Sequence, residues 1–414
     1  MTLATNDDMV PRMDKQPPGL AEIARVFIKI GAMSYGGPAI MGIMQAEIQE
    51  KRQWIDKERF VEGLALVNML PGPGATQLAI FLGHAVGGIV GGILAGICFI
   101  VPAFAIMLVL AGLYIAFGAL PSMRNAFYGI GPVVVGIFAV AVYRLARGTM
   151  KERSQIAIAA ATVAIVLWTP AGLAVTLLAA GCVGIALFYS WRAGAIALAV
   201  LAVACGAYYL AAPAIGSLEM PVFETDARPG SASLWQVAVF FFKVGAFTFG
   251  GGLSMLAFIQ EQVVNQFGWL SPQEFVDGLA LGQLTPGPVL MLAAFIGFKL
   301  FGAPGAAVAA TAIFLPSFLM ILSILPLLRG MKDLQWLKAF MRGVGPAVIG
   351  ALAVSLVQMA PHAAPDVFTW CVLALTIAIM LFYKVGTMSI MAGGAGLGLL
   401  ARGKAWELVL GLIR

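Results

Sequence analysis

The residues best suited to chemistry in this chain are two Pro-Gly-Pro triplets, each set in an apolar stretch. They are Pro71-Gly72-Pro73 in LVNMLPGPGATQ and Pro286-Gly287-Pro288 in LGQLTPGPVLML. Proline and glycine interrupt helices, so each triplet predicts two half-helices. The start of the second half-helix has free N–H groups and about half a positive charge. Because such an end binds anions readily, we expect recognition of an anion at these triplets.

A second pair of breaks lies upstream of each triplet. Gly36-Gly37 lies near the end of FIKIGAMSYGGP, and Gly250-Gly251 lies at the same place in the similar FFKVGAFTFGGG. Non-helical backbone inside a membrane is tolerated only where protein or water satisfies it. Broken half-helices that meet near the midplane form the substrate sites of many transporters. Four breaks that converge there predict a positive pocket lined by hydrogen-bond donors.

Two lysines repeat beside the glycine breaks. Lys29 and Lys243 each lie two residues before a repeated glycine, within an apolar run. A lysine exposed to lipid at the bilayer centre costs about 2.5 to 3.5 kcal/mol on insertion scales, so these charges are expected to face a cavity. The alternative is that both side chains snorkel to the interface from the starts of their helices.

Four neutral polar side chains also occur at paired positions. Ser34 and Thr248 could donate hydroxyl hydrogen bonds to an oxyanion or bond back to their own helices. Asn68 and Gln283 lie three residues before each triplet. Their amides could donate to the same anion or satisfy the carbonyl groups that proline leaves free.

Carboxylates are paired between the two halves as well. If they are desolvated, their pKa values rise, and one of them near an anion pocket could carry a coupling proton. The alternative, which the sequence supports equally well, is that these carboxylates are exposed to water at the ends of half-helices. The four acids are Glu47, Glu62, Glu261 and Asp277.

The composition excludes a soluble protein. Of 414 residues, 61% are hydrophobic and 11% are charged, and the mean hydropathy is +0.96. Many windows approach the roughly 20 apolar residues that a bilayer of about 30 Å requires. We therefore expect an all-α polytopic membrane protein. The net charge of +6 gathers in short loops, which indicates topology and not a nucleic-acid partner.

An internal repeat organises the chain. Residues 27–38 match 241–252 at an offset of 214, the triplet regions match after a shift of one, and GIGPVVVG at 129–136 matches GVGPAVIG at 343–350. The apolar segment 193–212 has no counterpart. The predicted domains are a disordered cytoplasmic tail at 1–19, a first repeat at 20–190, a linking helix and polar loop at 191–233, and a second repeat at 234–414.

Loop charges indicate that the repeats have opposite orientation. Loops 48–59 and 144–153 each hold four basic residues, and their counterparts hold none. The bias reverses in a third pair, in which the loop of the second repeat is the basic one. Since basic loops stay cytoplasmic, the repeats are predicted to be inverted, and Arg402 with Lys404 is the exception.

Segment lengths predict re-entrant helices within each repeat. About 27 residues separate the tail from the basic loop at residue 51, and two full crossings need about 40. A hairpin that turns at the glycines fits this length, and a second hairpin at 60–85 would turn at Pro71-Gly72-Pro73. Glycines at four-residue spacing in GHAVGGIVGGILAG (83–96) permit close helix contact, either within the protomer or across a homodimer.

Together these motifs resemble the chromate ion transporter family in its long, two-domain form. The resemblance rests on FxKxGxxxxGG near the start of each repeat, on Trp54 and Trp269 in the following loops, and on FVEGLALxxxLPGP and FVDGLALxxxTPGP. It implies a multi-pass transporter of the bacterial inner membrane that exports chromate, confers chromate resistance and uses the membrane potential or a proton gradient. Gly252 and Val289 replace Pro38 and Gly74, so the two pockets are not expected to be equal.

Alternatives within transport remain open. Sulfate is a tetrahedral dianion of similar size, and the residues give neither the direction of transport nor a choice between a transporter and a channel. An enzyme is not expected, because the sequence has no HExxH, GxSxG or P-loop motif and no Asp/His/Cys cluster with metal-ligand spacing. No cofactor is expected either.

Overall fold

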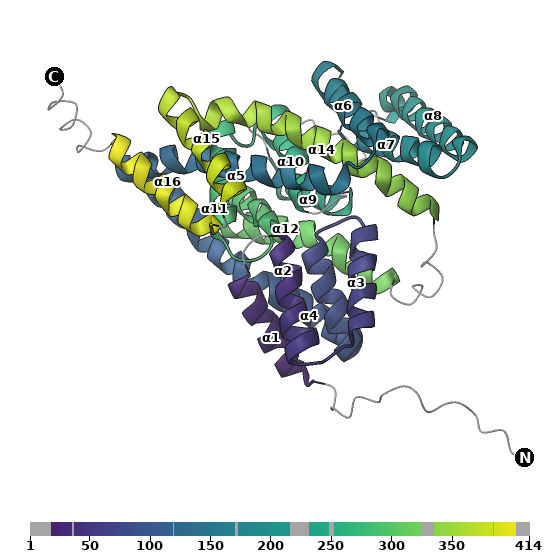
Figure 1. The fold of residues 1–414 in the computed structure, drawn as a ribbon, viewed down its shortest axis with the longest axis horizontal. Helices are drawn as coiled ribbons and strands as arrows, with labels where there is room; N and C mark the ends of the chain where they lie inside the picture. Colours follow the sequence, from purple (N-terminus) through teal and green to yellow (C-terminus); the bar gives the residue numbers. More distant parts are fainter. Residues whose placement is uncertain are drawn as a thin grey trace, which may run out of the picture.

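A computed structural model shows a helical protein (Figure 1). It describes residues 18–34, 37–118, 120–169, 173–215, 232–247, 252–324, 335–383 and 385–402, and every regular element in these ranges is a helix. The first half contains α1 (Leu20–Met33), α2 (Gly37–Met44) with a π-helical extension (Gln45–Lys51), α3 (Lys57–Met69), α4 (Gly74–Phe117), α5 (Pro121–Thr149), α6 (Arg153–Trp168), α7 (Leu173–Phe188) and α8 (Trp191–Ile215). The second half contains α9 (Leu234–Phe247), α10 (Gly252–Gln260) with a π-helical extension (Glu261–Gln266), α11 (Pro272–Leu284), a 3₁₀ turn (Val289–Met291), α12 (Leu292–Ile324), α14 (Gln335–Ala363), α15 (Val367–Phe382) and α16 (Thr387–Arg402).

Local sequence sets the ends of the broken helices. Asp56 caps α3 by accepting a hydrogen bond from the Arg59 N–H, and Ser271 forms a capping box with Glu274 at the start of α11. At their other ends, α3 and α11 stop at Leu70 and Thr285, which are both extended. Each of these residues precedes a proline, which disfavours helical backbone at the preceding position.

The 44-residue helix α4 folds back on itself near its first third. The backbone leaves helical geometry at Gly87 and Gly88, and Gly88 has φ +62°. Beyond this point the two parts pack side by side, since a Cβ built on Gly83 would lie 2.4 Å from the Gly91 carbonyl oxygen. The glycines at 83–96 therefore serve a contact within one chain. Phe301 and Gly302 repeat the same turn in α12.

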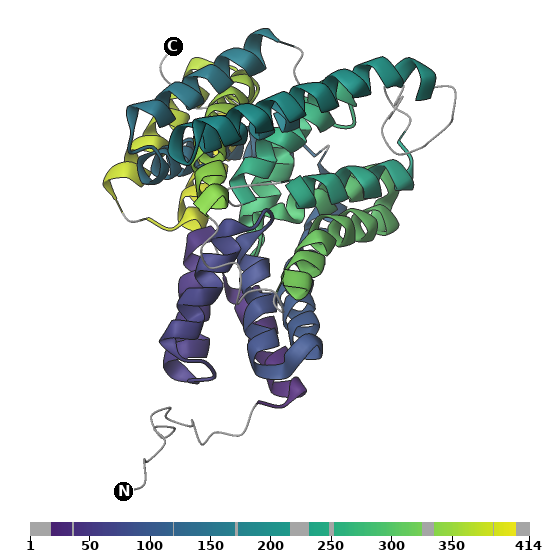
Figure 2. The same ribbon diagram turned by 90° about the vertical axis from the view of Figure 1, so that its right-hand side faces the viewer.

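Two helical hairpins precede this turn in the first repeat. Glu22 at the start of α1 pairs with Arg52 just after the π-helical extension of α2 at 2.8 Å, so the two ends of residues 20–52 meet. A Cβ built on Gly63 would lie 2.5 Å from the Phe81 ring, so α3 and the first part of α4 also pack against each other across Pro71-Gly72-Pro73. Figures 1 and 2 show α1, α2, α3 and the first part of α4 gathered at one end of the molecule.

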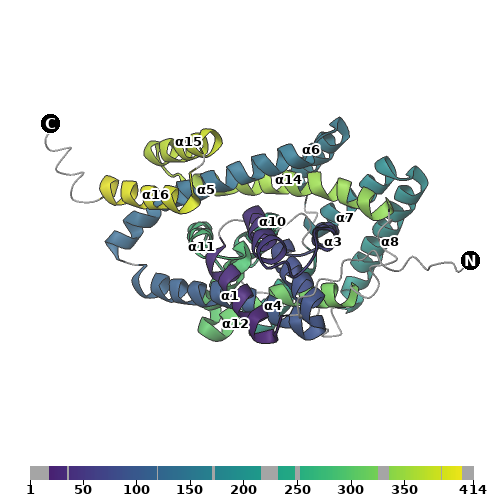
Figure 3. The same ribbon diagram turned by 60° about the horizontal axis from the view of Figure 1, so that its bottom comes forward.

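The later helices are exchanged between the repeats. Helices α6 and α7 pack on α14, and α15 and α16 pack on α5. At the closest crossings Gly184 meets Gly343, and Gly129 meets Gly398. At the offset of 214 residues between the repeats, Gly129 is equivalent to Gly343 and Gly184 to Gly398, so the two crossings are equivalent. Figure 3 shows α5, α14, α15 and α16 along one side of the molecule and α4 and α12 on the other.

This exchange has the pattern of an internal two-fold axis. If residue i touches residue j, then the equivalents of j and i touch as well, which is the signature of an isologous contact. Gly136 against Thr376 and Gly350 against Thr162 follow the same rule. The repeat in the sequence is therefore also a repeat in space.

The surface fits a membrane environment. Among the described residues four helical segments are long and apolar enough to cross a bilayer: Gly74–Phe117, Pro121–Thr149, Val289–Ile324 and Gln335–Ala363. Large apolar side chains face outward along the chain, such as Val203 and Val357 at 71% exposure. A soluble protein rarely exposes so much contiguous apolar surface. The chain is a multi-pass membrane protein whose regular elements, in the part that the structure describes, are all helices.

Candidate functional site

A glycine break of the first repeat meets the triplet of the second repeat. Helix α1 ends at Ser34, and the Gly287 N–H donates a 2.6 Å hydrogen bond to the Ser34 carbonyl oxygen. A Cβ built on Gly287 would lie 3.5 Å from the Gly31 carbonyl oxygen and 2.8 Å from the Ala103 Cβ. Gly287 has φ +98°, which glycine alone adopts without strain. Two of the four predicted breaks are therefore brought together.

The triplet of the first repeat forms a tight, buried turn. Gly72 has φ +119°, and the Gln77 amide nitrogen donates a 2.5 Å hydrogen bond to the Pro71 carbonyl oxygen across the turn. A Cβ on Gly72 would lie 2.6 Å from this amide nitrogen and 3.0 Å from the Ser317 hydroxyl oxygen. Ser317 belongs to α12, so both repeats contribute to this turn.

Several buried polar atoms of the described residues have no hydrogen-bond partner, and four of them belong to residues on segments around the triplets. Across the residues that the structure describes, five fully buried side-chain polar atoms have no hydrogen-bond partner: Ser34 Oγ, Thr76 Oγ1, Gln77 Oε1, Ser317 Oγ and Trp269 Nε1. The residues that carry the four oxygens are all 0% exposed. Leaving a buried polar group unsatisfied costs about 1 to 3 kcal/mol, so such a group in a native protein calls for a bound water, an ion or a ligand that completes it.

The start of α4 adds backbone donors to these side chains. No side chain caps this end, and the first intrahelical bond of the segment runs from the Gln77 N–H to the Pro73 carbonyl. The N–H groups of residues 74–76 therefore have no partner within the helix. With the helix dipole they give a positive, donating surface at the turn. This arrangement can bind an oxyanion without any charged side chain.

The other predicted site residues differ in burial, and some lie outside the part of the chain that the structure describes. Lys29 lies on the exposed face of α1, and Lys243 is half-buried on α9. Gln283 is half-buried near the end of α11, and Gly37 is the first residue of α2. Outside the described residues, or with an undescribed side chain, lie Gly36, Asn68, Thr248, Gly250 and Gly251. Their binding roles stay predictions.

Two of the predicted coupling acids are paired with cations. Glu47 accepts hydrogen bonds from Arg52 at 3.2 Å and Lys51 at 3.4 Å, and Glu62 pairs with Arg59 at 2.8 Å. Partial burial raises the pKa of Glu47. The Arg52 hydrogen bond and the charges of Lys51 and Lys29 lower it by more than burial raises it, so the pKa lies below its ordinary value. Glu47 is thus held ionised.

Asp277 has a different environment. It is 6% exposed on α11 and accepts hydrogen bonds from the Tyr114 hydroxyl at 2.7 Å and the Gln273 amide at 3.1 Å. No ion pair joins it to a cation among the described residues. Tyr114 belongs to α4 and packs edge-on against Phe127 and Phe295. The buried carboxylate therefore links the two repeats through neutral donors.

Glu261 faces a cavity of about 250 Å³. Its carboxylate accepts hydrogen bonds from the Asn265 amide at 2.7 Å and the Gln266 amide at 3.4 Å. The cavity lies between α6, α7, α10 and α14, and its polar lining includes Thr169, Gln266, Ser355 and Gln358. It therefore joins helices from both repeats.

Sequence reasoning missed four residues at these sites. Thr76 and Gln77 directly follow the first triplet, and their polarity within an apolar run could have identified them. Ser317 and Tyr114 gave no such signal, because they join the turn and Asp277 from distant parts of the chain. Ser34 was predicted and does lie at the meeting of the breaks.

A helical membrane protein with an internal two-fold axis, and with helix breaks that meet in its interior, belongs to the class of membrane transport proteins. Comparison with known proteins specifies the class further. The family described as "Chromate transporter" matches residues 21–185 and 235–399. The chain belongs to the chromate transporter family, in its two-domain form, and members of this family are transporters, not enzymes.

Full-length relatives agree with this assignment. A chromate transport protein of Cupriavidus metallidurans is 36% identical over 395 residues, covering 92% of this chain and 93% of the relative. A probable chromate transport protein of Synechococcus elongatus is 33% identical and covers 89% and 91%. A chromate transport protein of Pseudomonas aeruginosa is 30% identical and covers 81% and 79%. No solved structure matches the chain.

Proposed function

We propose that this protein is a secondary transporter of a tetrahedral oxyanion, with chromate as the substrate and efflux from the bacterial cytoplasm as the direction. Export of this kind gives chromate resistance. The inner membrane is the proposed location, and neither a cofactor nor a metal is needed. Sulfate, a dianion of the same shape, is the competing substrate.

One observation carries the proposal. Helix breaks from the two repeats meet at the Gly287 to Ser34 hydrogen bond, and three unpartnered buried hydroxyl groups, those of Ser34, Thr76 and Ser317, lie on the segments around the two triplets. Buried donors without partners are costly unless a ligand completes them. A tetrahedral oxyanion offers acceptors in several directions, so it can complete hydroxyl and N–H donors together. The substrate is therefore proposed to bind in the protein interior beside the Pro-Gly-Pro turns.

The membrane arrangement follows from helix lengths. A helix of 14 residues, such as α1, is about 21 Å long and is too short for a bilayer core of about 30 Å. The hairpins of α1 with α2, and of α3 with the first part of α4, are accordingly re-entrant in this proposal. Each returns to the side from which it entered. With the swapped loop charges, the internal two-fold axis then lies in the membrane plane and inverts the repeats.

Coupling is proposed to involve Asp277. It is the most buried of the four predicted acids, and it has no cation partner among the described residues. Protonation of a buried carboxylate removes a costly charge. Because its Tyr114 partner comes from the other repeat, a change in charge at Asp277 alters a contact between repeats. Lys243 and Lys29 are retained as proposed attracting charges for the anion.

Transport in proteoliposomes tests this function. Radiolabelled chromate is added outside vesicles with imposed pH or voltage gradients, and sulfate is measured in parallel. Chromate flux that responds to a gradient supports a secondary transporter. Flux of neither anion would refute the proposal, and chromate flux that ignores both gradients would indicate a channel.

Cell-based transport tests the direction. Cells that carry the protein should accumulate less chromate and tolerate more of it than cells that carry an empty vector. Greater accumulation would indicate uptake. Fusions of a reporter to loops 144–153 and 358–367 test the topology, because inverted repeats place these two loops on opposite sides of the membrane.

A further inference from the structure

The two Pro-Gly-Pro turns are equivalent in sequence but lie in different chemical surroundings. Beside Gly72 lie the Gln77 amide and the Ser317 hydroxyl, whereas beside Gly287 lie the Ala103 methyl group and the Gly31 carbonyl. Ser317 and Ala103 occupy equivalent positions, 214 residues apart. The second repeat therefore supplies a hydroxyl to the first turn, and the first repeat returns only a methyl group.

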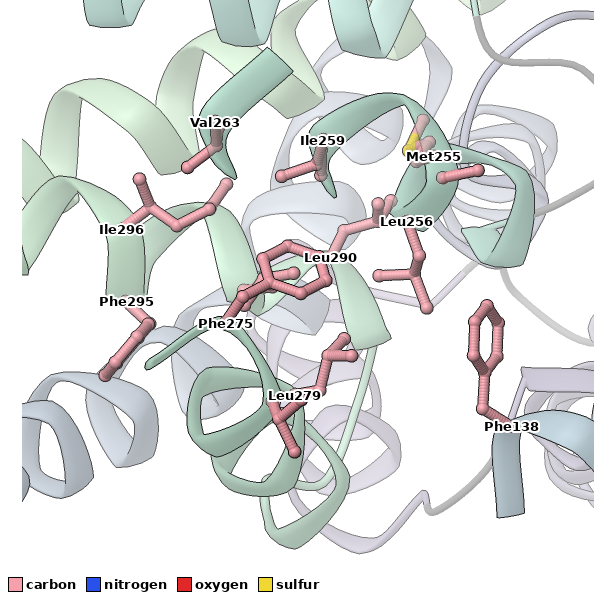
Figure 4. Packing of buried hydrophobic residues seen from close by; sticks show 14 of the residues in the cluster. Phe138, Met255, Leu256, Ile259, Val263, Phe275, Leu279, Leu290, Phe295 and Ile296 are labelled. Atoms are coloured by element: carbon pink, nitrogen blue, oxygen red, sulfur yellow. The ribbon is translucent and has the colours of Figure 1, made fainter. Parts of the chain in front are cut away.

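The helices that leave the turns differ in the same direction. Helix α4 starts at Gly74 and carries Thr76 and Gln77 in its first turn. The matching stretch, Leu290 to Leu292, is apolar whichever register is chosen, and it begins as a 3₁₀ turn. Figure 4 shows Leu290 within the hydrophobic cluster close to Phe275 and Leu279. The second turn thus leads into packed core.

The backbone of the second turn is also already engaged. The Gly287 N–H donates to the Ser34 carbonyl oxygen at 2.6 Å. The adjacent Thr285 hydroxyl donates to the Leu281 carbonyl oxygen at 2.8 Å. In contrast, two hydroxyl groups near the first turn, those of Thr76 and Ser317, have no partner, whereas near the second turn the hydroxyl without a partner is that of Ser34, whose carbonyl already accepts from Gly287.

From this asymmetry we infer that the transporter has one oxyanion site, at the start of α4, and that the second turn is a structural element. The inference rests on the proposed function. The ligand is a tetrahedral oxyanion held by the N–H groups of residues 74–76 and by the hydroxyls of Thr76 and Ser317. Gln77 is a positioning residue, since its amide holds the Pro71 carbonyl and so fixes the turn.

A single oxyanion site in a protein with two equivalent repeats still depends on both repeats. Ser317 brings a donor from the second repeat to a turn of the first, so a movement of the repeats relative to each other changes the site. An isolated first repeat would lack this donor. Because both repeats supply hydrogen-bond donors to one site, the second turn needs glycine and proline for its shape but no polar side chain for binding.

A matched pair of threonine variants tests the inference in the full-length protein. Thr76→Val removes an unpartnered hydroxyl beside the first turn, and Thr285→Val removes a bonded hydroxyl beside the second turn. The measurement is the chromate concentration that half-saturates flux in proteoliposomes. We expect Thr76→Val and Ser317→Ala to raise it about tenfold or more, as loss of a hydrogen bond to a charged ligand does. Thr285→Val should leave it within about twofold.

Stability distinguishes a binding role from a structural one. Removing an unpartnered buried hydroxyl should leave the unfolding midpoint in detergent unchanged or higher, whereas Thr285→Val should lower it. An unchanged half-saturating concentration in both Thr76→Val and Ser317→Ala would overturn the single site while the transport function stands. Equal weakening by Thr285→Val would indicate two sites. Absence of chromate flux in the unmodified protein would instead refute the proposed function.

Discussion

The turn at Gly72 predicts a large effect for the smallest substitution, Gly72→Ala. The φ angle of +119° is outside the range of residues with a Cβ, and such a conformation costs roughly 1 to 3 kcal/mol. The new methyl group would also lie 2.6 Å from the Gln77 amide nitrogen. Displacing Gln77 breaks its hydrogen bond to Pro71, which is worth about 0.5 to 1.5 kcal/mol. Together these terms amount to about 1.5 to 4.5 kcal/mol.

Denaturant unfolding in mild detergent measures this loss, and chromate flux measures its functional consequence. The matched control is Gly42→Ala in α2, where a Cβ would meet nothing within 4 Å and the helix should gain about 0.5 to 1 kcal/mol. Flux should be lost in Gly72→Ala and kept in Gly42→Ala. A Gly72→Ala protein that is as stable and active as the unmodified protein would refute the geometry described for this turn.

Further predictions concern the contacts between repeats, the ion pairs and the coupling acid. Gly184→Ala should destabilise the protein in denaturant titrations, because its Cβ would lie 2.5 Å from the Ala339 carbonyl oxygen, whereas Gly148→Ala, with nothing within 4 Å, should not. Glu47→Gln should lower the unfolding midpoint at pH 7, and Glu50→Gln, on the exposed side of the same segment, should not. Because the pKa of Glu47 is lowered in the folded protein, its stabilising effect is complete above the ordinary glutamate pKa of about 4.3. The difference from Gln should vanish as the pH falls through the lowered pKa, and a difference that persists there would contradict the ion pair. Asp277→Asn should make chromate flux insensitive to an imposed pH gradient, while Glu62→Gln keeps that response, and equal behaviour would remove Asp277 from the coupling role.

The features of the chain that depend on composition or on neighbouring residues could be predicted from the sequence. The all-helical membrane class follows from 61% hydrophobic residues, since a bilayer leaves the backbone no other way to satisfy its hydrogen bonds in long apolar segments. The helix breaks at residues 71–73 and 286–288 follow from proline and glycine, whose effect on the backbone is local. Family membership was also predictable, because the paired motifs are contiguous in sequence.

Contacts between distant segments were not predictable. The donation from Gly287 to Ser34, the approach of Ser317 to Gly72 and the pairing of Tyr114 with Asp277 each join segments far apart in the sequence. No local propensity encodes such contacts, since they depend on how the repeats dock.

The sequence by itself determined the repeats and the breaks. The sequence predicted that the two pockets differ, and only the tertiary structure decided how they differ, with the Gln77 and Ser317 side chains beside Gly72 but a methyl group and a backbone carbonyl beside Gly287. It also decided that the glycines at 83–96 fold α4 back on itself within one chain. The physical reason is that proline and glycine act through their own backbone, whereas the chemistry around a turn is supplied by whichever side chains the packed helices bring to it.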